Sequence, residues 1–101
     1  MSTNYANRVK LSAANSAAVG TSAVDLVPEN QGRRYLRIQN AHATAKVGLS
    51  LDAGSTPAVA TAGSITLGPG ESIVFEDTIV PLNAIRAISD TLATPVTVWE
   101  N

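Results

Sequence analysis

The 101-residue chain carries seven basic and eight acidic residues, one histidine and no cysteine. This composition excludes disulfides and thiolate metal sites, and it offers no cluster of positive charge for nucleic acid or an anionic membrane. No stretch approaches the roughly 20 apolar residues of a membrane span, and the polar first ten residues lack the apolar run of a secretory signal. We therefore expect one domain that uses no cofactor and is made or assembled in the cytoplasm.

Residues 1–21 differ from the rest of the chain. They are polar at first and then rich in alanine and serine, so they have little apolar surface to bury. Basic and apolar residues alternate over residues 8–11, as in a short strand or an extended arm. An alanine-rich helix over residues 12–19 would be too short to be stable alone. We interpret residues 1–21 as an N-terminal arm or edge segment, and residues 22–101 as the folded domain.

From residue 22 onward, short apolar runs recur at a spacing of about ten residues and are separated by Pro, Gly, Asn and Asp. The expected strands cover residues 23–27, 34–40, 47–51, 64–67, 71–76, 84–88 and 95–99. A long loop is expected over residues 52–63, and a tight turn at Gly68-Pro69-Gly70. The pattern predicts an all-β protein, an antiparallel β-sandwich of jelly-roll-like form with about seven or eight short strands.

The clearest alternation places Leu36 and Ile38 toward the core and Tyr35, Arg37 and Gln39 outward. The same alternation in the last expected strand puts its tryptophan on the face opposite the neighbouring valines. Both strands therefore present large side chains on the side that faces away from the core.

The main basic concentration is Arg33 and Arg34 together with Arg37. These arginines either meet carboxylates on a partner subunit or form the solvated outer face of a strand. Trp99 has three interpretations: a cover for the edge of the core, an interface anchor, or a stacking platform for a sugar. The residues alone leave these alternatives open.

Little in the chain suggests catalysis. His42 has no other ligand-type residue close in sequence and is interpreted as a turn residue. Glu76 and Asp77, with Glu71 nearby, are the one acidic concentration, but adjacent strand residues point to opposite faces. They are interpreted as a solvated strand end or a weak cation site. A small hydrolase that uses these carboxylates is the third functional hypothesis, after the two given below. We expect no catalytic, cofactor-binding or metal-binding residues and no enzymatic activity.

Residues 26–40 have a recognisable order: a Pro-x-Asn turn leads through arginine into a Leu-x-Ile-x-Asn strand. This segment resembles small structural proteins of tailed bacteriophages. Residues 64–75, and the closing pieces 84–88 and 97–100, fit the same resemblance, which covers about residues 20–101. The matching positions are turn and core residues, so the resemblance transfers no site residues.

The resemblance implies a capsid decoration (cement) protein, or another small head or tail component. Such a protein binds the outside of an assembled shell, often as a trimer, and bridges neighbouring capsid subunits. The implied partners are the major capsid protein or other virion proteins and further copies of the chain, and the implied location is the virion, after assembly in the host cytoplasm. From the residues themselves, the expected partner contacts are Tyr5, Arg8, Lys10, Arg33, Arg34, Arg37 and Trp99.

One further function is compatible with the same residues. A carbohydrate- or receptor-binding module of a tail or fibre would use Trp99, Tyr35 and the long loop over residues 52–63.

Overall fold

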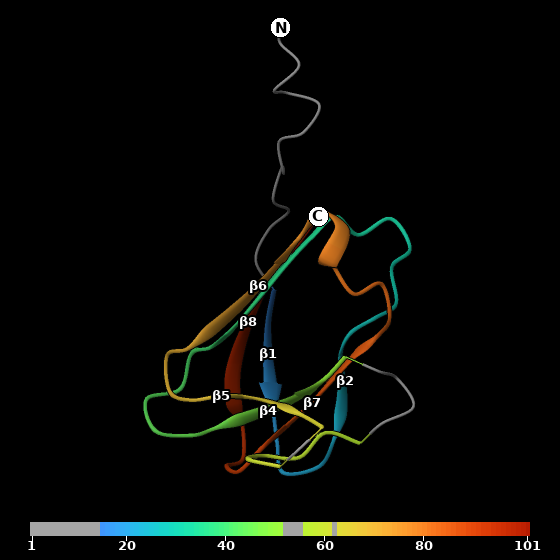
Figure 1. The fold of residues 1–101 in the computed structure, drawn as a ribbon. Helices are drawn as coiled ribbons and strands as arrows, with labels where there is room; N and C mark the ends of the chain where they lie inside the picture. The colour runs from blue at the N-terminus through green and yellow to red at the C-terminus, as the bar shows by residue number, and fades with distance from the viewer. Residues whose placement is uncertain (1–14, 52–55, 62) are drawn as a thin grey trace, which may run out of the picture.

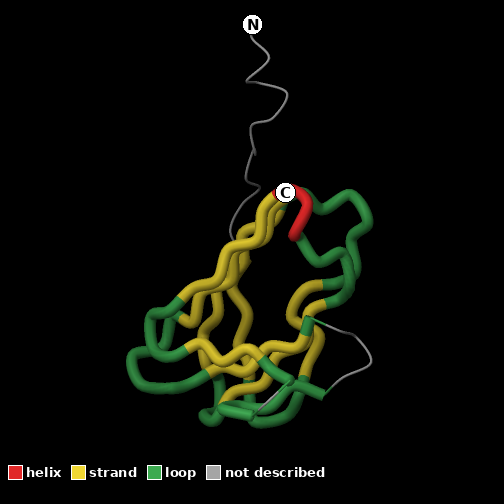
Figure 2. Tube along the Cα trace, in the orientation of Figure 1, coloured by secondary structure: helices red, strands yellow, loops and turns green. Residues whose placement is uncertain are grey.

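The computed structural model describes residues 15–51, 56–61 and 63–101. Within these ranges, eight strands form two four-stranded antiparallel sheets that stack as a sandwich (Figure 1). The strands are β1 (Asn15–Val19), β2 (Val24–Val27), β3 (Tyr35–Asn40), β4 (Val47–Ser50), β5 (Ile65–Leu67), β6 (Ser72–Glu76), β7 (Ile85–Ser89) and β8 (Thr94–Glu100). One 3₁₀ turn, η1 (Asp77–Ile79), lies near the C-terminus (Figure 2). The predicted all-β antiparallel sandwich is confirmed.

The two sheets have the strand orders β1-β8-β3-β6 and β2-β7-β4-β5. The pairing is nested: β4 pairs with β5, β3 with β6, β2 with β7, and β1 with β8. The chain therefore behaves as one long hairpin that is wrapped so that successive pairs fall alternately in the two sheets. β8 lies between β1 and β3, which brings the end of the described chain against its beginning.

The core lies between the sheets and is almost entirely aliphatic. Leu36 and Ile38 on β3 are fully buried, whereas Tyr35, Arg37 and Gln39 are only partly buried on the other face, as the alternation predicts. Burying each large aliphatic side chain contributes roughly 1.5–3 kcal/mol. The buried apolar cluster comprises Val19, Val27, Leu36, Ile38, Val47, Leu49, Leu67, Ile85, Ala87, Val96 and Val98.

β1 lies inside the segment 1–21 that the sequence separates from the domain. It is an edge strand, paired with β8 from Asn15 opposite Val98 to Val19 opposite Thr94. Val19 is fully buried in the core. Residues 15–19 of this segment therefore form an edge strand of the sandwich, and the buried Val19 packs in the core.

β2 differs in phase from the sequence prediction, which put Val24 and Leu26 on one face. A register irregularity between Asp25 and Val27 interrupts the pairing with β7. Beyond it, Val27 is buried, while Val24 is 40% exposed. A bulge inserts one residue and so reverses which side chains face the core.

β4 is buried along its whole length, and the backbone of Ala58 and Val59 lies against it at Gly48. A Cβ at Gly48 would lie 2.6 Å from the carbonyl oxygen of Ala58, so only glycine fits there. Part of the predicted long loop is therefore a cover on the second sheet. Residues 52–55 and 62 of that loop lie outside the described residues.

The predicted turn at Gly68-Pro69-Gly70 is present, with Gly70 at φ +75°, which glycine adopts without strain. It joins two different sheets, since β5 pairs with β4 and β6 pairs with β3. The turn is thus a corner of the sandwich and leaves β6 at the edge of its sheet.

Candidate protein-contact surface on the outer face of one sheet

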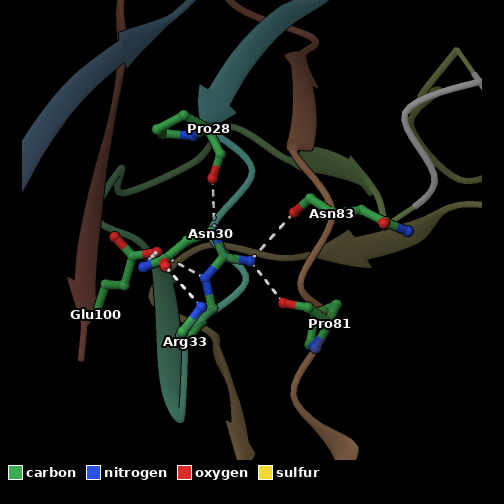
Figure 3. Close-up of polar contacts among 7 residues, drawn as sticks. Pro28, Asn30, Arg33, Pro81, Asn83 and Glu100 are labelled. Atoms are coloured by element: carbon green, nitrogen blue, oxygen red, sulfur yellow. Dashed lines mark hydrogen bonds and ion pairs between the residues drawn. The ribbon is translucent and has the colours of Figure 1, made fainter.

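Arg33, in the loop between β2 and β3, is an internal anchor. Its side chain is fully buried, and Nε donates to the Glu100 carboxylate at 2.6 Å. One terminal nitrogen donates to the Pro81 and Asn83 carbonyls at 2.5 and 3.1 Å, and the other donates to the Pro28 carbonyl at 2.6 Å (Figure 3). The planar guanidinium thereby connects the end of β2, the segment before β7 and the end of β8.

This geometry corrects both sequence interpretations of Arg33, which placed it on a partner contact or a solvated strand face. A buried charge is tolerated only when it is paired and hydrogen-bonded. The four donated bonds meet that requirement inside the molecule. Arg33 therefore holds the fold together and is removed from the candidate surface.

The asparagines of the resembling segment also have internal roles. The Asn30 side chain accepts the Gly32 N–H at 3.0 Å and donates to Glu100 at 3.3 Å, beside the Arg33 anchor. Asn40 is fully buried, and its amide donates to the carbonyls of Ala45, Leu67 and Gly68 at 2.7 to 3.2 Å. The Pro-x-Asn, Arg and final Asn of this segment are therefore fold determinants.

The outer face of the β1-β8-β3-β6 sheet holds the largest side chains among the remaining predicted residues. We define the Trp99 patch as Tyr35, Arg37, Val74, Glu76 and Trp99. The register places Trp99 of β8 and Val74 of β6 directly opposite Arg37, one on each side. Tyr35 is opposite Glu76 and diagonal to Trp99, within reach of an aromatic side chain.

Arg37 and Trp99 form a stacked pair at the centre of this patch. The guanidinium carbon lies 5.0 Å from the centroid of the indole ring, a cation–π distance. Arg37 Nε is buried and has no hydrogen-bond partner among the described residues. Val74, on the other side of the arginine, is 42% exposed. The patch thus combines a pre-positioned arginine and tryptophan with exposed apolar surface.

The sequence predicted some members of this patch. Arg37 and Trp99 are brought together as direct cross-strand neighbours. Arg34 directly precedes β3 and is exposed at the end of that strand. Its backbone N–H donates a hydrogen bond to the Asn101 carbonyl at 2.6 Å. Val74 was not singled out, although its place between two inward residues of β6 marks it as outward. Tyr5, Arg8 and Lys10 lie outside the described residues.

The described residues offer little for catalysis. They contain no pocket and no group of three or more potential metal ligands. The Glu71 carboxylate accepts the Gly68 N–H, and Glu76 is an exposed residue of the outer face. His42 occupies a turn, where its Nδ1 accepts the N–H groups of Thr44 and Ala45 at 3.0 and 2.9 Å. The side chain of Asp77 is outside the described part.

One carboxylate has a perturbed acidity. A hydrogen bond from the Lys46 backbone N–H lowers the pKa of Asp90 below the usual aspartate value, and the Thr91 hydroxyl and the Lys46 charge act in the same direction. Asp90 is fully exposed in the β7–β8 turn. Its interactions stabilise the turn and form no reactive site.

No family model, curated protein or solved structure matches this chain. No helix in the described ranges is long and apolar enough to cross a bilayer. The function must therefore be argued from the surface itself.

Proposed function

We propose that this chain is a non-enzymatic structural protein of a phage virion, and specifically a capsid decoration protein that binds the assembled head through the Trp99 patch. The observation that carries the proposal is the Arg37–Trp99 stack on the outer face of a sheet, beside the exposed Val74, where the described residues form no pocket. The resemblance of residues 26–40 to small structural proteins of tailed phages gives the class of partner. The nested strand pairing supports the finer jelly-roll description of the sandwich.

The composition of the patch suits a protein interface. Trp, Tyr and Arg are the residues most enriched among those that dominate binding energy. A guanidinium already stacked on an indole loses little freedom on binding, which favours association. If several copies are joined, each further contact with a shell becomes intramolecular, so modest individual affinity is sufficient.

The second candidate is a carbohydrate- or receptor-binding module, and the observation in its favour is that Tyr35 and Trp99 share one face. A sugar stacks on an open aromatic ring. The Arg37 guanidinium lies over the Trp99 ring, so one face of that ring is already occupied. The absence of a pocket among the described residues also removes the walls that would orient hydroxyl groups. These two features favour the protein partner.

The test is co-sedimentation of the purified protein with heads assembled from the major capsid protein of the same phage. We expect the native protein to sediment with heads, and Trp99→Ala to weaken binding about 30-fold, which corresponds to a hot spot of about 2 kcal/mol. The matched control is Arg86→Ala on the other sheet, which should bind normally. Unfolding in urea establishes that both variants are folded.

Two results would overturn the proposal. The first is that the folded native protein does not sediment with assembled heads. The second is glycan-array binding that Trp99→Ala abolishes while head binding stays unchanged, which would favour the carbohydrate module.

A further inference from the structure

The described part of the sandwich has four edge strands, and three of them are poor templates for pairing. β2 is interrupted by its bulge, and β5 has only three residues. β1 consists mostly of Ala, Ser and Asn, which form strands weakly. β6 has five residues in regular register with β3, and its sequence Ser-Ile-Val-Phe-Glu contains neither proline nor lysine. Natural edge strands often carry a proline or a lysine, which hinders pairing with another strand.

The free hydrogen-bonding groups of β6 can be assigned from the register. Asn40 donates its N–H to the Glu71 carbonyl at 2.9 Å. Because bonded pairs alternate in an antiparallel ladder, the next residues of β6 that bond to β3 are Ile73 and Phe75. The N–H and C=O groups of Ser72, Val74 and Glu76 therefore point away from the sheet, where an additional strand would bind.

The side chains along this edge alternate in character. Ile73 and Phe75 face the core but are only partly buried, since β6 is the outermost of the described strands in its sheet. Val74 and Glu76 face outward and are exposed. An incoming strand that matches this edge would place apolar residues on the core side and basic residues on the outer side.

Residues 7–11, Asn-Arg-Val-Lys-Leu, have this alternation. Val9 and Leu11 fall on one side of a strand, and Arg8 and Lys10 on the other. The charges are also complementary. Residues 1–14 contain two basic and no acidic residues, so residues 15–101 hold the remaining five basic and all eight acidic residues, a net charge of −3.

We propose that residues 7–11 of one copy add to the β6 edge of a second copy as a fifth strand. Val9 and Leu11 then cover Ile73 and Phe75, and the basic side chains lie beside Glu76. Each copy donates one arm and accepts one, so the contact closes either as a reciprocal dimer or as a small ring. This inference does not depend on the proposed function, because it concerns contacts between copies of the chain.

The same chain cannot make this contact. Asn15 is four positions after Leu11, and these four steps span at most about 14 Å when fully extended. β1 and β6 are opposite edges of one sheet, so a strand added beyond β6 lies four strand spacings from β1, about 19 Å. An arm that pairs with β6 must therefore come from another copy.

Pairing of two β6 edges with each other is less favourable. An antiparallel pair centred on Val74 would bring together two strands that are both flanked by Glu71, Glu76 and Asp77. Like charges across neighbouring strands are destabilising. The basic arm is the better partner on charge, and the experiment separates the two arrangements.

Because the chain has no cysteine, introduced cysteines report only the contact under test. Lys10→Cys protein is mixed with Val74→Cys protein, oxidised, and analysed without reductant; Lys10→Cys with Lys46→Cys is the control mixture. We expect the disulfide between positions 10 and 74 to predominate. Predominant Val74→Cys self-linkage would overturn the arm contact in favour of edge-to-edge pairing, and equal linkage in the control mixture would overturn it as non-specific.

The second measurement is sedimentation of the full-length protein, which should be oligomeric. Val74→Pro removes an outward N–H that makes no bond to β3, and it should weaken association at least tenfold, whereas Val74→Thr should stay within about threefold. Arg8→Gln with Lys10→Gln should weaken it about two- to tenfold. Ser2→Glu with Thr3→Glu changes the charge of the arm by the same amount and should have less effect. A native protein that is monomeric at tens of micromolar would refute the proposal.

Discussion

Replacing Arg33 by methionine tests the internal anchor most directly. The substitution keeps an apolar stem of similar length but removes four hydrogen bonds: one to the Glu100 carboxylate and three to carbonyls. At about 1.5–3 kcal/mol for each bond to a charged group, their simple sum would be about 6–12 kcal/mol. Such contributions are not additive, and the Glu100 side chain is 25% exposed, so water can solvate its carboxylate in the variant.

The expected loss is therefore the range measured when one partner of a buried ion pair is removed, about 3–5 kcal/mol. This is a large part of the 5–15 kcal/mol that stabilises a typical domain. Urea unfolding followed by tryptophan fluorescence measures it, because the single tryptophan, Trp99, lies next to Glu100. The urea midpoint should fall by more than about 1 M.

Two further variants separate the possible causes. Arg86→Met makes the same substitution in a surface ion pair with Asp25, whose side chain is 72% exposed, and should cost less than about 1 kcal/mol. Arg33→Lys keeps the charge, but one ammonium group cannot reach all the acceptors of the guanidinium, so most of the loss should remain. If Arg33→Met were no more destabilising than Arg86→Met, the anchor would have no special role in stability.

Three other outcomes follow from local geometry. Asn40→Leu leaves three carbonyls without their buried donor and should lower the free energy of unfolding by about 1–3 kcal/mol in urea melts. Gly48→Ala should destabilise by about 1–3 kcal/mol, because its Cβ meets the Ala58 backbone, whereas Gly20→Ala, with nothing within 4 Å of the new Cβ, should change stability by less than about 1 kcal/mol. The pKa of Asp90 is lowered in the folded state, so the charged carboxylate stabilises the fold above the unfolded-state pKa, and this contribution is lost as pH falls through the folded-state pKa. NMR titration of the Asp90 carboxyl should show a pKa below the usual aspartate value. The difference in unfolding free energy between the native protein and Asp90→Asn should become smaller in acid.

The sequence predicted the sandwich well where one rule governs a strand. Leu36 and Ile38 alternate with polar neighbours, and that pattern alone fixed both the strand and its buried face. Asn40 continues the same inward phase, so its burial could also have been inferred, together with its need for partners. The β2 bulge could not, because it depends on how the strand fits β7 rather than on its own residues.

The candidate surface was only partly predictable for a related reason. Arg33 and Arg37 look alike in sequence. Arg33 is buried among the carbonyls of Pro28, Pro81 and Asn83 and the Glu100 carboxylate, whereas Arg37 is stacked on Trp99. Arg33 is internal because a segment about fifty residues later in the chain supplies carbonyl acceptors for it, and no local sequence pattern contains that information. Cross-strand register, known only from the fold, assigns each arginine its role.

The nested pairing of the strands has a consequence for how the chain folds. The innermost pair, β4 with β5, is closest in sequence, and each further pair joins segments that are more distant along the chain, ending with β1 and β8. Closing the long loops first would cost more entropy, so the ladder should form from the middle outward. Because β8 lies between β1 and β3, β1 can pair in its sheet only after β8 has left the ribosome. Folding should therefore be slow for a protein of this size, with the pairing of β1 and β8 as a late step.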